Sequence, residues 1–320
     1  MSSTLARQFN IRISFVHRLR SLLYLAVLTA AVAAPQMVAA QDSNGAVEKT
    51  MVFQGLTRTY YVHTPLSYSG SPVPLLFCLH GGGGTAKGTA QWTHMSDTAD
   101  RYGFMVVYPQ GVYKHWQDGR NEKGYQYVDD VAFFNALIDQ LSKDYSVDQQ
   151  RIYAIGISNG GFMVQRLACQ LSNRIAAVCS IAASRLENMP YSPATPIPIM
   201  FVLGTADNFV PWNGGPIKSA PDAPGEVYSA NETIHYWTDV NKTAPFAPIL
   251  FDRTYADQTR VTIKVYGSSA GDDIESVTVY GGGHCWPGEL MPLPKFLIGT
   301  TSPFDTNTYA WAFFRNHPHH

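Results

Sequence analysis

Residues 151–163 read RIYAIGISNGGFM and carry the most informative local pattern of the sequence. The stretch opens with a short apolar run, residues 151–157, of the kind that forms a strand buried on both faces of a sheet. The glycine-flanked serine of Gly156-Ile157-Ser158-Asn159-Gly160 follows, and residues 161–169 continue as a helical segment. This order predicts a sharp strand–helix turn that exposes Ser158 at the sheet edge. An ordinary glycine-rich turn is the alternative interpretation of the same residues.

The alternation of strand and helix continues on both sides of this stretch. Four more apolar runs are expected to be strands: residues 73–79, 104–108, 175–182 and 197–204. Residues 128–145 carry apolar side chains three and four positions apart, which predicts a helix that Asp129 and Asp130 cap. The pattern predicts an α/β fold with a mostly parallel, doubly wound sheet flanked by helices.

The remaining segments complete one predicted domain, residues 41–320, because no linker separates a second one. Residues 50–65 are expected to form an edge hairpin around Gln54-Gly55, and residues 208–228 a long surface loop. Further helices are expected at residues 229–241 and 307–315, and further strands at residues 261–265 and 276–280.

The first forty residues have the layout of a secretory signal peptide. Four arginines precede the uncharged residues 21–34, and Val38-Ala39-Ala40 offers the small residues that a signal peptidase cleaves. The apolar run is shorter than the roughly 20 residues that cross a bilayer. We expect removal of residues 1–40, a secreted or periplasmic protein, and no membrane contact afterwards.

Composition excludes several classes of protein. With 45% hydrophobic and 15% charged residues, the chain is globular rather than disordered. Removing the four arginines of residues 1–40 leaves 19 basic and 24 acidic residues, a formal charge of −5, which argues against a nucleic-acid partner. No Cys-x-x-Cys motif occurs among Cys78, Cys169, Cys179 and Cys285, which argues against structural zinc. Cys78 and Cys179 lie in apolar runs typical of buried free thiols; disulfide pairing and oligomeric state do not follow from the sequence.

A nucleophilic serine needs a base and an acid. His284 follows a predicted strand and three glycines, which favours it as the base over His235 in a helix or the frayed histidines at the C-terminus. Asp207 directly follows the apolar run 197–204, at the sheet edge where active sites of open α/β sheets are built. A turn-capping aspartate is the alternative role for Asp207.

Backbone donors for a developing oxyanion are expected from two places. The N–H of Asn159 opens the helix after Ser158, and the glycines of His80-Gly81-Gly82-Gly83-Gly84, which follow another strand, let backbone N–H groups approach an anionic oxygen closely. The same glycines partly match a dinucleotide-binding motif. That interpretation needs an acidic residue after the next strand, where Tyr108-Pro109-Gln110-Gly111 stands instead.

Four aromatic residues lie in loops near these motifs and are candidates for a substrate platform: Trp116, Phe209, Trp212 and Trp286. Packing within their own loops is the alternative role.

Taken together, the motifs resemble the secreted α/β-hydrolase esterases that include polyhydroxybutyrate depolymerases, feruloyl esterases and acetylxylan esterases. The resemblance covers about residues 73–315. Besides the segments above it includes Trp116-Gln117-Asp118-Gly119-Arg120 and Val128-Asp129-Asp130-Val131. It implies a catalytic triad of Ser158, Asp207 and His284, with oxyanion donors from Asn159 and residues 82–83.

The resemblance implies a serine esterase that hydrolyses carboxylic esters without a metal or an organic cofactor. A hydroxyalkanoate polyester or its oligomers are the first expected substrate, and a feruloyl or acetyl ester of plant polysaccharide is the alternative. A non-catalytic, carbohydrate-binding relative of the fold is the alternative from another class. Polymer-degrading relatives often carry a separate binding domain, for which this chain leaves no room; action on a solid polymer is therefore not expected.

Overall fold

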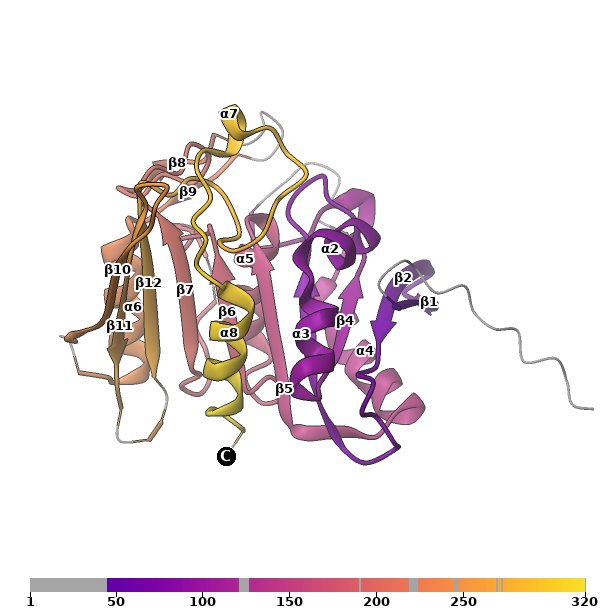
Figure 1. The fold of residues 1–320 in the computed structure, drawn as a ribbon. Coiled ribbons are helices and arrows are strands. Elements are labelled where there is room, and N and C mark those ends of the chain that lie inside the picture. Colours follow the sequence, from indigo (N-terminus) through magenta and orange to yellow (C-terminus); the bar gives the residue numbers. More distant parts are fainter. Residues whose placement is uncertain are drawn as a thin grey trace, which may run out of the picture. The chain divides into compact units, whose positions relative to one another are not determined.

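In the part of the chain that the structure describes, ten strands form one sheet in the order β1-β2-β4-β3-β5-β6-β7-β12-β11-β10 (Figure 1). The structure is a computed structural model that describes residues 45–120, 127–189, 191–218, 224–244, 247–268, 270–271 and 273–319. The strands are β1 (Val47–Phe53), β2 (Leu56–His63), β3 (Val73–Leu79), β4 (Met105–Pro109), β5 (Val147–Ile157), β6 (Ala177–Ile181), β7 (Ile199–Gly204), β10 (Ile249–Thr254), β11 (Arg260–Tyr266) and β12 (Ile274–Tyr280).

The central strands β4, β3, β5, β6, β7 and β12 are parallel to one another, and β1, β2, β10 and β11 extend the two edges by antiparallel pairing. The continuously apolar runs of the sequence form the central strands because helices cover both of their faces. In β3, Leu75 and Phe77 pack into one core cluster and Leu76 and Cys78 into the other. The predicted mostly parallel, doubly wound sheet flanked by helices is confirmed.

Helices on the two faces enclose these two cores. One face packs against α4 (Asp130–Asp144), α5 (Asn159–Gln170) and α6 (Ala230–Asn241). The other packs against α2 (Ala86–Thr93), α3 (Met95–Tyr102) and α8 (Thr306–Arg315), and α3 and α8 lie side by side (Figure 1). The short helices η1 (Val112–Lys114) and α7 (Lys295–Ile298) lie in loops.

The start of α4 differs from the expectation that both aspartates cap it. Asp129 is the N-cap, and its side chain accepts from the Ala132 N–H. Asp130 is fully buried instead, where it accepts from Arg58 at 2.7 Å and from the Gln117 N–H at 2.8 Å. A carboxylate without solvent needs such a partner, and Arg58 comes from the distant strand β2.

Most predicted elements lie within four residues of the observed ones, whereas some elements were not predicted. The expected hairpin is present as β1 and β2, with Gln54 and Gly55 both at positive φ as a tight turn of this kind requires. The elements α2, α3 and β10 were not predicted, and the predicted surface loop 208–228 contains the short strands β8 (Gly215–Pro216) and β9 (Glu226–Val227). In β10 nearly all residues are exposed, so the strand lacks the apolar alternation that would reveal it.

The predicted signal peptide, residues 1–40, lies outside the described residues, and the extent of the single domain stays a prediction. Within the described ranges, no helix combines the length and the apolar character that a membrane crossing requires.

Candidate active site

Four loops that carry the predicted groups meet at one edge of the sheet. They follow β3, β5, β7 and β12, which run in the same direction, so that their carboxyl ends lie at the same edge. The loops carry, in this order, residues 81–84, Ser158, Asp207 and His284.

Ser158 occupies a strained turn between β5 and α5. Its φ of 57° and ψ of −123° lie in a region that residues other than glycine avoid. Two glycines let the turn close: a Cβ at Gly156 would lie 2.5 Å from the Gly160 oxygen, and one at Gly160 would lie 2.6 Å from the His80 oxygen. This is the strand–turn–helix geometry expected from the sequence, and it leaves Ser158 partly exposed.

Asp207 and His284 form a buried pair although 77 positions separate them in the sequence. His284 Nδ1 lies 2.8 Å from Asp207 Oδ2, and the two side chains are only 6% and 3% exposed. Oδ1 of Asp207 accepts from the N–H groups of Phe209 and Val210, both at 2.8 Å. Both roles weighed for Asp207 are therefore present, because one oxygen caps the turn and the other binds the imidazole.

A cavity of about 360 Å³ brings Ser158 and His284 together. Residues 81–84 form one wall, Thr89 and Trp92 of α2 form another, and residues 291–293 close the third. A larger cavity of about 480 Å³ exists elsewhere at this end of the fold, but it is lined by neither Ser158 nor His284. We take the smaller cavity as the candidate active site because it holds the serine and the imidazole.

The three predicted oxyanion donors differ in whether their N–H groups already have an acceptor. The N–H of Asn159 is a first-turn donor of α5, which no carbonyl of its own helix can accept. Gly82 lies against Asn159, since a Cβ at Gly82 would be 3.7 Å from the Asn159 Cβ. The N–H of Gly83 already donates to the Lys114 carbonyl at 2.9 Å. The expectation for Gly83 is therefore wrong in this conformation, and Gly82 is the glycine that stays a candidate.

Comparison with known proteins relates this chain to esterases. Residues 58–189 match the family model described as esterase PHB depolymerase. A protein of Nocardia uniformis subsp. tsuyamanensis, named as the esterase NocK, is 29% identical over 79% of this chain and 77% of its own length. Feruloyl esterase B of Piromyces equi is 31% identical over 58% of this chain, which spans only 35% of that protein. The chain is therefore similar to esterases, both over residues 58–189 and over most of its length.

The fold of the esterase agrees with a solved relative. The acetyl xylan esterase from Aspergillus awamori superimposes with a TM-score of 0.55 over 81% of this chain and 94% of that one. At 14% sequence identity this similarity concerns the fold alone, which is the α/β-hydrolase fold. Because both the matched family and the NocK protein are named as esterases, the chain is a carboxylic ester hydrolase.

The aromatic platform expected from the sequence is largely wrong for the esterase. Trp116 and Trp286 are completely buried, and their indole N–H groups donate to the His80 carbonyl and to Asn307. A ring without accessible surface cannot contact a substrate. Phe209 packs edge-on against the His284 ring at 5.0 Å, whereas Trp212 is partly buried and packs against the hydrophobic core. Neither belongs to the cavity wall around Ser158.

Trp92 is the aromatic residue of the cavity, and sequence reasoning missed it. It lies on α2, a helix that was not predicted, and its ring packs edge-on against buried Trp286 at 5.7 Å. Met291, Pro292 and Leu293 were missed as well. They lie only seven to nine residues after His284, and their position in the sequence was the one available indication.

His80 forms hydrogen bonds that hold the glycine loop, residues 81–84, in place. Its Nδ1 lies 2.8 Å from the Gly81 carbonyl, and its Nε2 lies 2.9 Å from the Gly111 N–H. A neutral ring satisfies both contacts, with Nδ1–H as donor and Nε2 as acceptor. Burial lowers the pKa of His80 to about 4, so the ring stays neutral at ordinary pH.

The esterase is expected to lose stability in acid through His80. Unfolded His80, with an ordinary pKa of 6.5, takes up a proton that the folded ring refuses until about pH 4. The stabilisation is complete above pH 6.5 and is lost as the pH falls toward 4, by up to about 3 kcal/mol. Urea unfolding across this pH range should show a shallower decline for His80→Gln than for the wild type. Parallel pH profiles would contradict the prediction.

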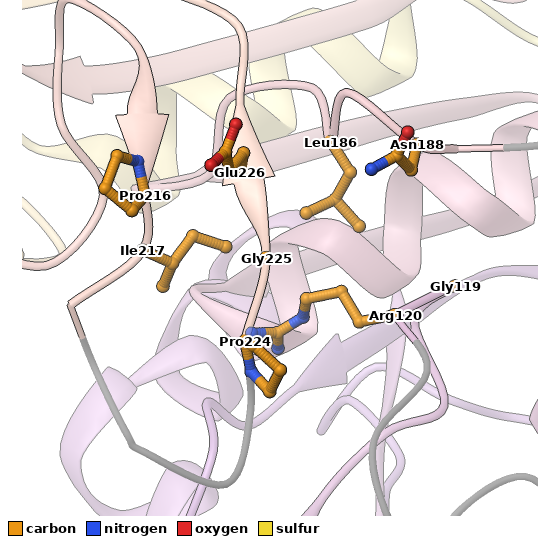
Figure 2. Close-up of a pocket in the computed structure, with 9 residues that line it drawn as sticks. All are labelled: Gly119, Arg120, Leu186, Asn188, Pro216, Ile217, Pro224, Gly225 and Glu226. Atoms are coloured by element: carbon orange, nitrogen blue, oxygen red, sulfur yellow. The ribbon is translucent and has the colours of Figure 1, made fainter.

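The larger cavity has both apolar and polar groups in its wall (Figure 2). Leu186, Ile217 and Pro224 supply apolar surface, whereas Asn188 and Glu226 supply polar groups. The Arg120 side chain forms part of its wall (Figure 2).

The four cysteines of the esterase are buried and free, as expected for Cys78 and Cys179. Burial raises the pKa of Cys285, the nearest of them to His284 in sequence, to about 11, which keeps that thiol protonated. Among the described residues, no group of three or more His, Cys, Asp or Glu side chains has the geometry of a metal site.

Proposed function

We propose that this esterase hydrolyses carboxylic esters through Ser158, His284 and Asp207. The observation that carries the proposal is the buried His284–Asp207 pair, whose imidazole shares a cavity with a serine held in a strained, partly exposed turn. In such a set, the acid orients the imidazole and the imidazole activates the serine.

The proposed reaction is a two-step acyl transfer. Ser158 Oγ attacks the ester carbonyl carbon while His284 Nε2 accepts the hydroxyl proton, and Asp207 stabilises the resulting imidazolium. The N–H groups of Asn159 and Gly82 hold the negative oxygen of the tetrahedral intermediate. The proton on His284 then passes to the departing alcohol. Water then attacks the acyl-enzyme while His284 accepts a proton from it, and His284 returns this proton to Ser158 Oγ as the acid leaves.

We propose an aliphatic substrate, a hydroxyalkanoate oligomer or polyester, because the cavity is mostly apolar. Trp92, Met291 and Leu293 line it, and the loop that supplies Leu293 also exposes Leu290 and Phe296, which are 82% and 81% accessible. Large exposed apolar side chains beside a cavity favour an apolar ligand over a hydroxyl-rich one. The exposed apolar side chains of this loop also support a hydroxyalkanoate chain as the substrate.

A feruloyl ester is the second candidate. Trp92 offers a ring edge or face to an aromatic acyl group, and relatives such as the Piromyces equi protein are named feruloyl esterases. An acetylxylan ester fits the apolar cavity less well, because an acetyl group uses little of its volume.

A substrate panel tests the proposal: short-chain nitrophenyl esters, hydroxybutyrate oligomers, methyl ferulate and acetylated xylan. We expect hydroxybutyrate oligomers to have the highest kcat/KM among the natural ester types, and a fluorophosphonate probe to label Ser158. Fastest turnover of methyl ferulate would favour the second candidate instead. No turnover and no labelling would favour a non-catalytic, carbohydrate-binding protein.

We also propose that the protein is exported and that residues 1–40 are removed. The arginines, the apolar run and the small residues before position 41 support this step. Sequencing the N-terminus of protein recovered from the periplasm or the medium tests it, and a first residue other than one near position 41 would contradict it.

A further inference from the structure

The segment Trp116-Gln117-Asp118-Gly119-Arg120 lines no part of the cavity around Ser158, yet its residues hold both loops that supply the proposed oxyanion donors. We propose that Asp118, fixed by Arg120, is a positioning residue that sets the oxyanion hole through the side chain of Asn159. The inference rests on the proposed function and adds a role for residues outside the triad.

The carboxamide of Asn159 is bound at both ends. Its Oδ1 accepts from the Trp116 N–H at 2.8 Å, and its Nδ2 donates to the Trp116 carbonyl at 3.0 Å and to Asp118 Oδ2 at 2.7 Å. Asn159 is 2% exposed and Asp118 is fully buried, so water does not compete for these bonds. The side chain of Asn159 is therefore fixed, and with it the direction of its backbone N–H at the start of α5.

Asp118 is itself held by a charged neighbour. Arg120 Nε lies 3.1 Å from both carboxylate oxygens, and Nη2 donates to Oδ2 at 2.7 Å. The guanidinium also lies 5.1 Å from the ring centre of Phe162, which belongs to the same helix as Asn159. A forked ion pair of this kind determines both the place and the orientation of the carboxylate.

On the side away from Asp118, the Arg120 side chain packs against the wall of the larger cavity. A Cβ at Gly225 would lie 2.7 Å from Arg120 Cδ, so the strand segment beside the cavity packs directly on the arginine stem (Figure 2). Only 7% of Arg120 is exposed. The ion pair therefore forms the link between that wall and Asn159.

The same segment reaches the second donor loop. Trp116 Nε1 donates to the His80 carbonyl at 2.9 Å, and the two rings pack at 4.8 Å. His80 in turn bonds to the carbonyl of Gly81, next to Gly82. One buried network thus spans from Asn159 to the glycine loop and fixes the separation of their N–H groups. An oxyanion hole requires such preorganisation, because its donors act only at hydrogen-bond distance from the developing charge.

Asp118→Asn in the full chain tests the proposal. The variant keeps the shape of the side chain, but its NH₂ group cannot accept a hydrogen bond, so the contact with Asn159 Nδ2 or with Arg120 is lost. We expect kcat to fall about 10- to 100-fold with KM nearly unchanged, because the lost interaction acts on the transition state. Binding of a trifluoromethyl ketone, which forms an oxyanion on the serine, should weaken by the same factor as kcat/KM.

Two further variants keep the test decisive if Asp118→Asn folds poorly. Arg120→Lys retains the charge but loses the fork, and a smaller fall in kcat is expected. Asp100→Asn is the matched control: Asp100 also accepts from a side chain, His63, and from a backbone N–H, that of Leu66, but lies away from the network. We expect its kcat to remain that of the wild type.

The proposal is overturned if Asp118→Asn and Arg120→Lys lower thermal stability alone and leave kcat and ketone affinity unchanged. It is also overturned if Asp100→Asn lowers kcat by the same factor. Failure of the proposed function has a different signature, namely turnover that survives in Ser158→Ala.

Discussion

Replacing Ser158 with alanine is expected to lower kcat for ester hydrolysis by about 10⁶-fold, to the level that binding and the oxyanion donors alone provide. The change removes only the attacking oxygen. Alanine keeps a Cβ at the strained φ of 57°, so the turn and α5 should persist. Turnover of a nitrophenyl ester and labelling by a fluorophosphonate measure the loss.

A second serine provides the control for this experiment. Ser184 is 2% exposed and forms no part of the cavity around Ser158. Ser184→Ala should keep wild-type turnover and labelling. Substantial turnover in Ser158→Ala would contradict the proposed nucleophile, whereas loss of turnover in both variants would indicate a general effect on folding.

Replacing Asp207 with asparagine is expected to lower kcat by about 10⁴-fold near neutral pH. The oxygen of the new amide can still accept from the Phe209 and Val210 N–H groups, which preserves the turn. Its NH₂ group then faces His284 Nδ1 and favours the tautomer with a proton on Nε2. That nitrogen can no longer accept the proton of Ser158.

Two comparisons separate this effect from a loss of stability. Asp257 also caps a turn, accepting from the N–H and hydroxyl of Thr259, but no histidine contacts it in the structure. Asp257→Asn should therefore leave kcat unchanged. Asp207→Ala removes the turn cap as well, so it should lower both the melting temperature and kcat. A kcat of Asp207→Asn close to that of the wild type would contradict the assigned acid.

The strands and most helices could be predicted because their sequence patterns reflect local constraints. A strand covered by helices on both faces must be apolar throughout, as in Val73–Leu79, and α4 must place an apolar stripe on the core. The helices α2 and α3 bury mostly Ala, Thr and Ser, so their core-facing sides carry no strong apolar signal. Only their packing against the sheet reveals them as helices.

In the candidate site, too, some residues could be predicted from local sequence patterns and others depend on tertiary contacts. Ser158 and Asp207 each follow an apolar strand, His284 follows the more polar strand β12, and parallel strands bring their following loops to one edge. The occupation of the Gly83 N–H depends on the Lys114 carbonyl, which is far away in the sequence. The burial of Trp116 and Trp286 likewise depends on contacts with His80 and Asn307. No local pattern distinguishes a buried indole in a loop from an exposed one.

By itself the sequence determined the α/β class of this protein, the strained turn at Ser158 and the strand ends that carry Asp207 and His284. Those features follow from the period of apolar residues and from glycine spacing, which act over a few neighbouring residues. Tertiary structure alone decided that Asp207 uses its two oxygens for two tasks, that Trp92 rather than Trp116 lines the cavity, and that Asp118 binds Asn159. The reason is physical: hydrogen-bond partners and accessible surface are set by segments that meet only when the sheet has formed.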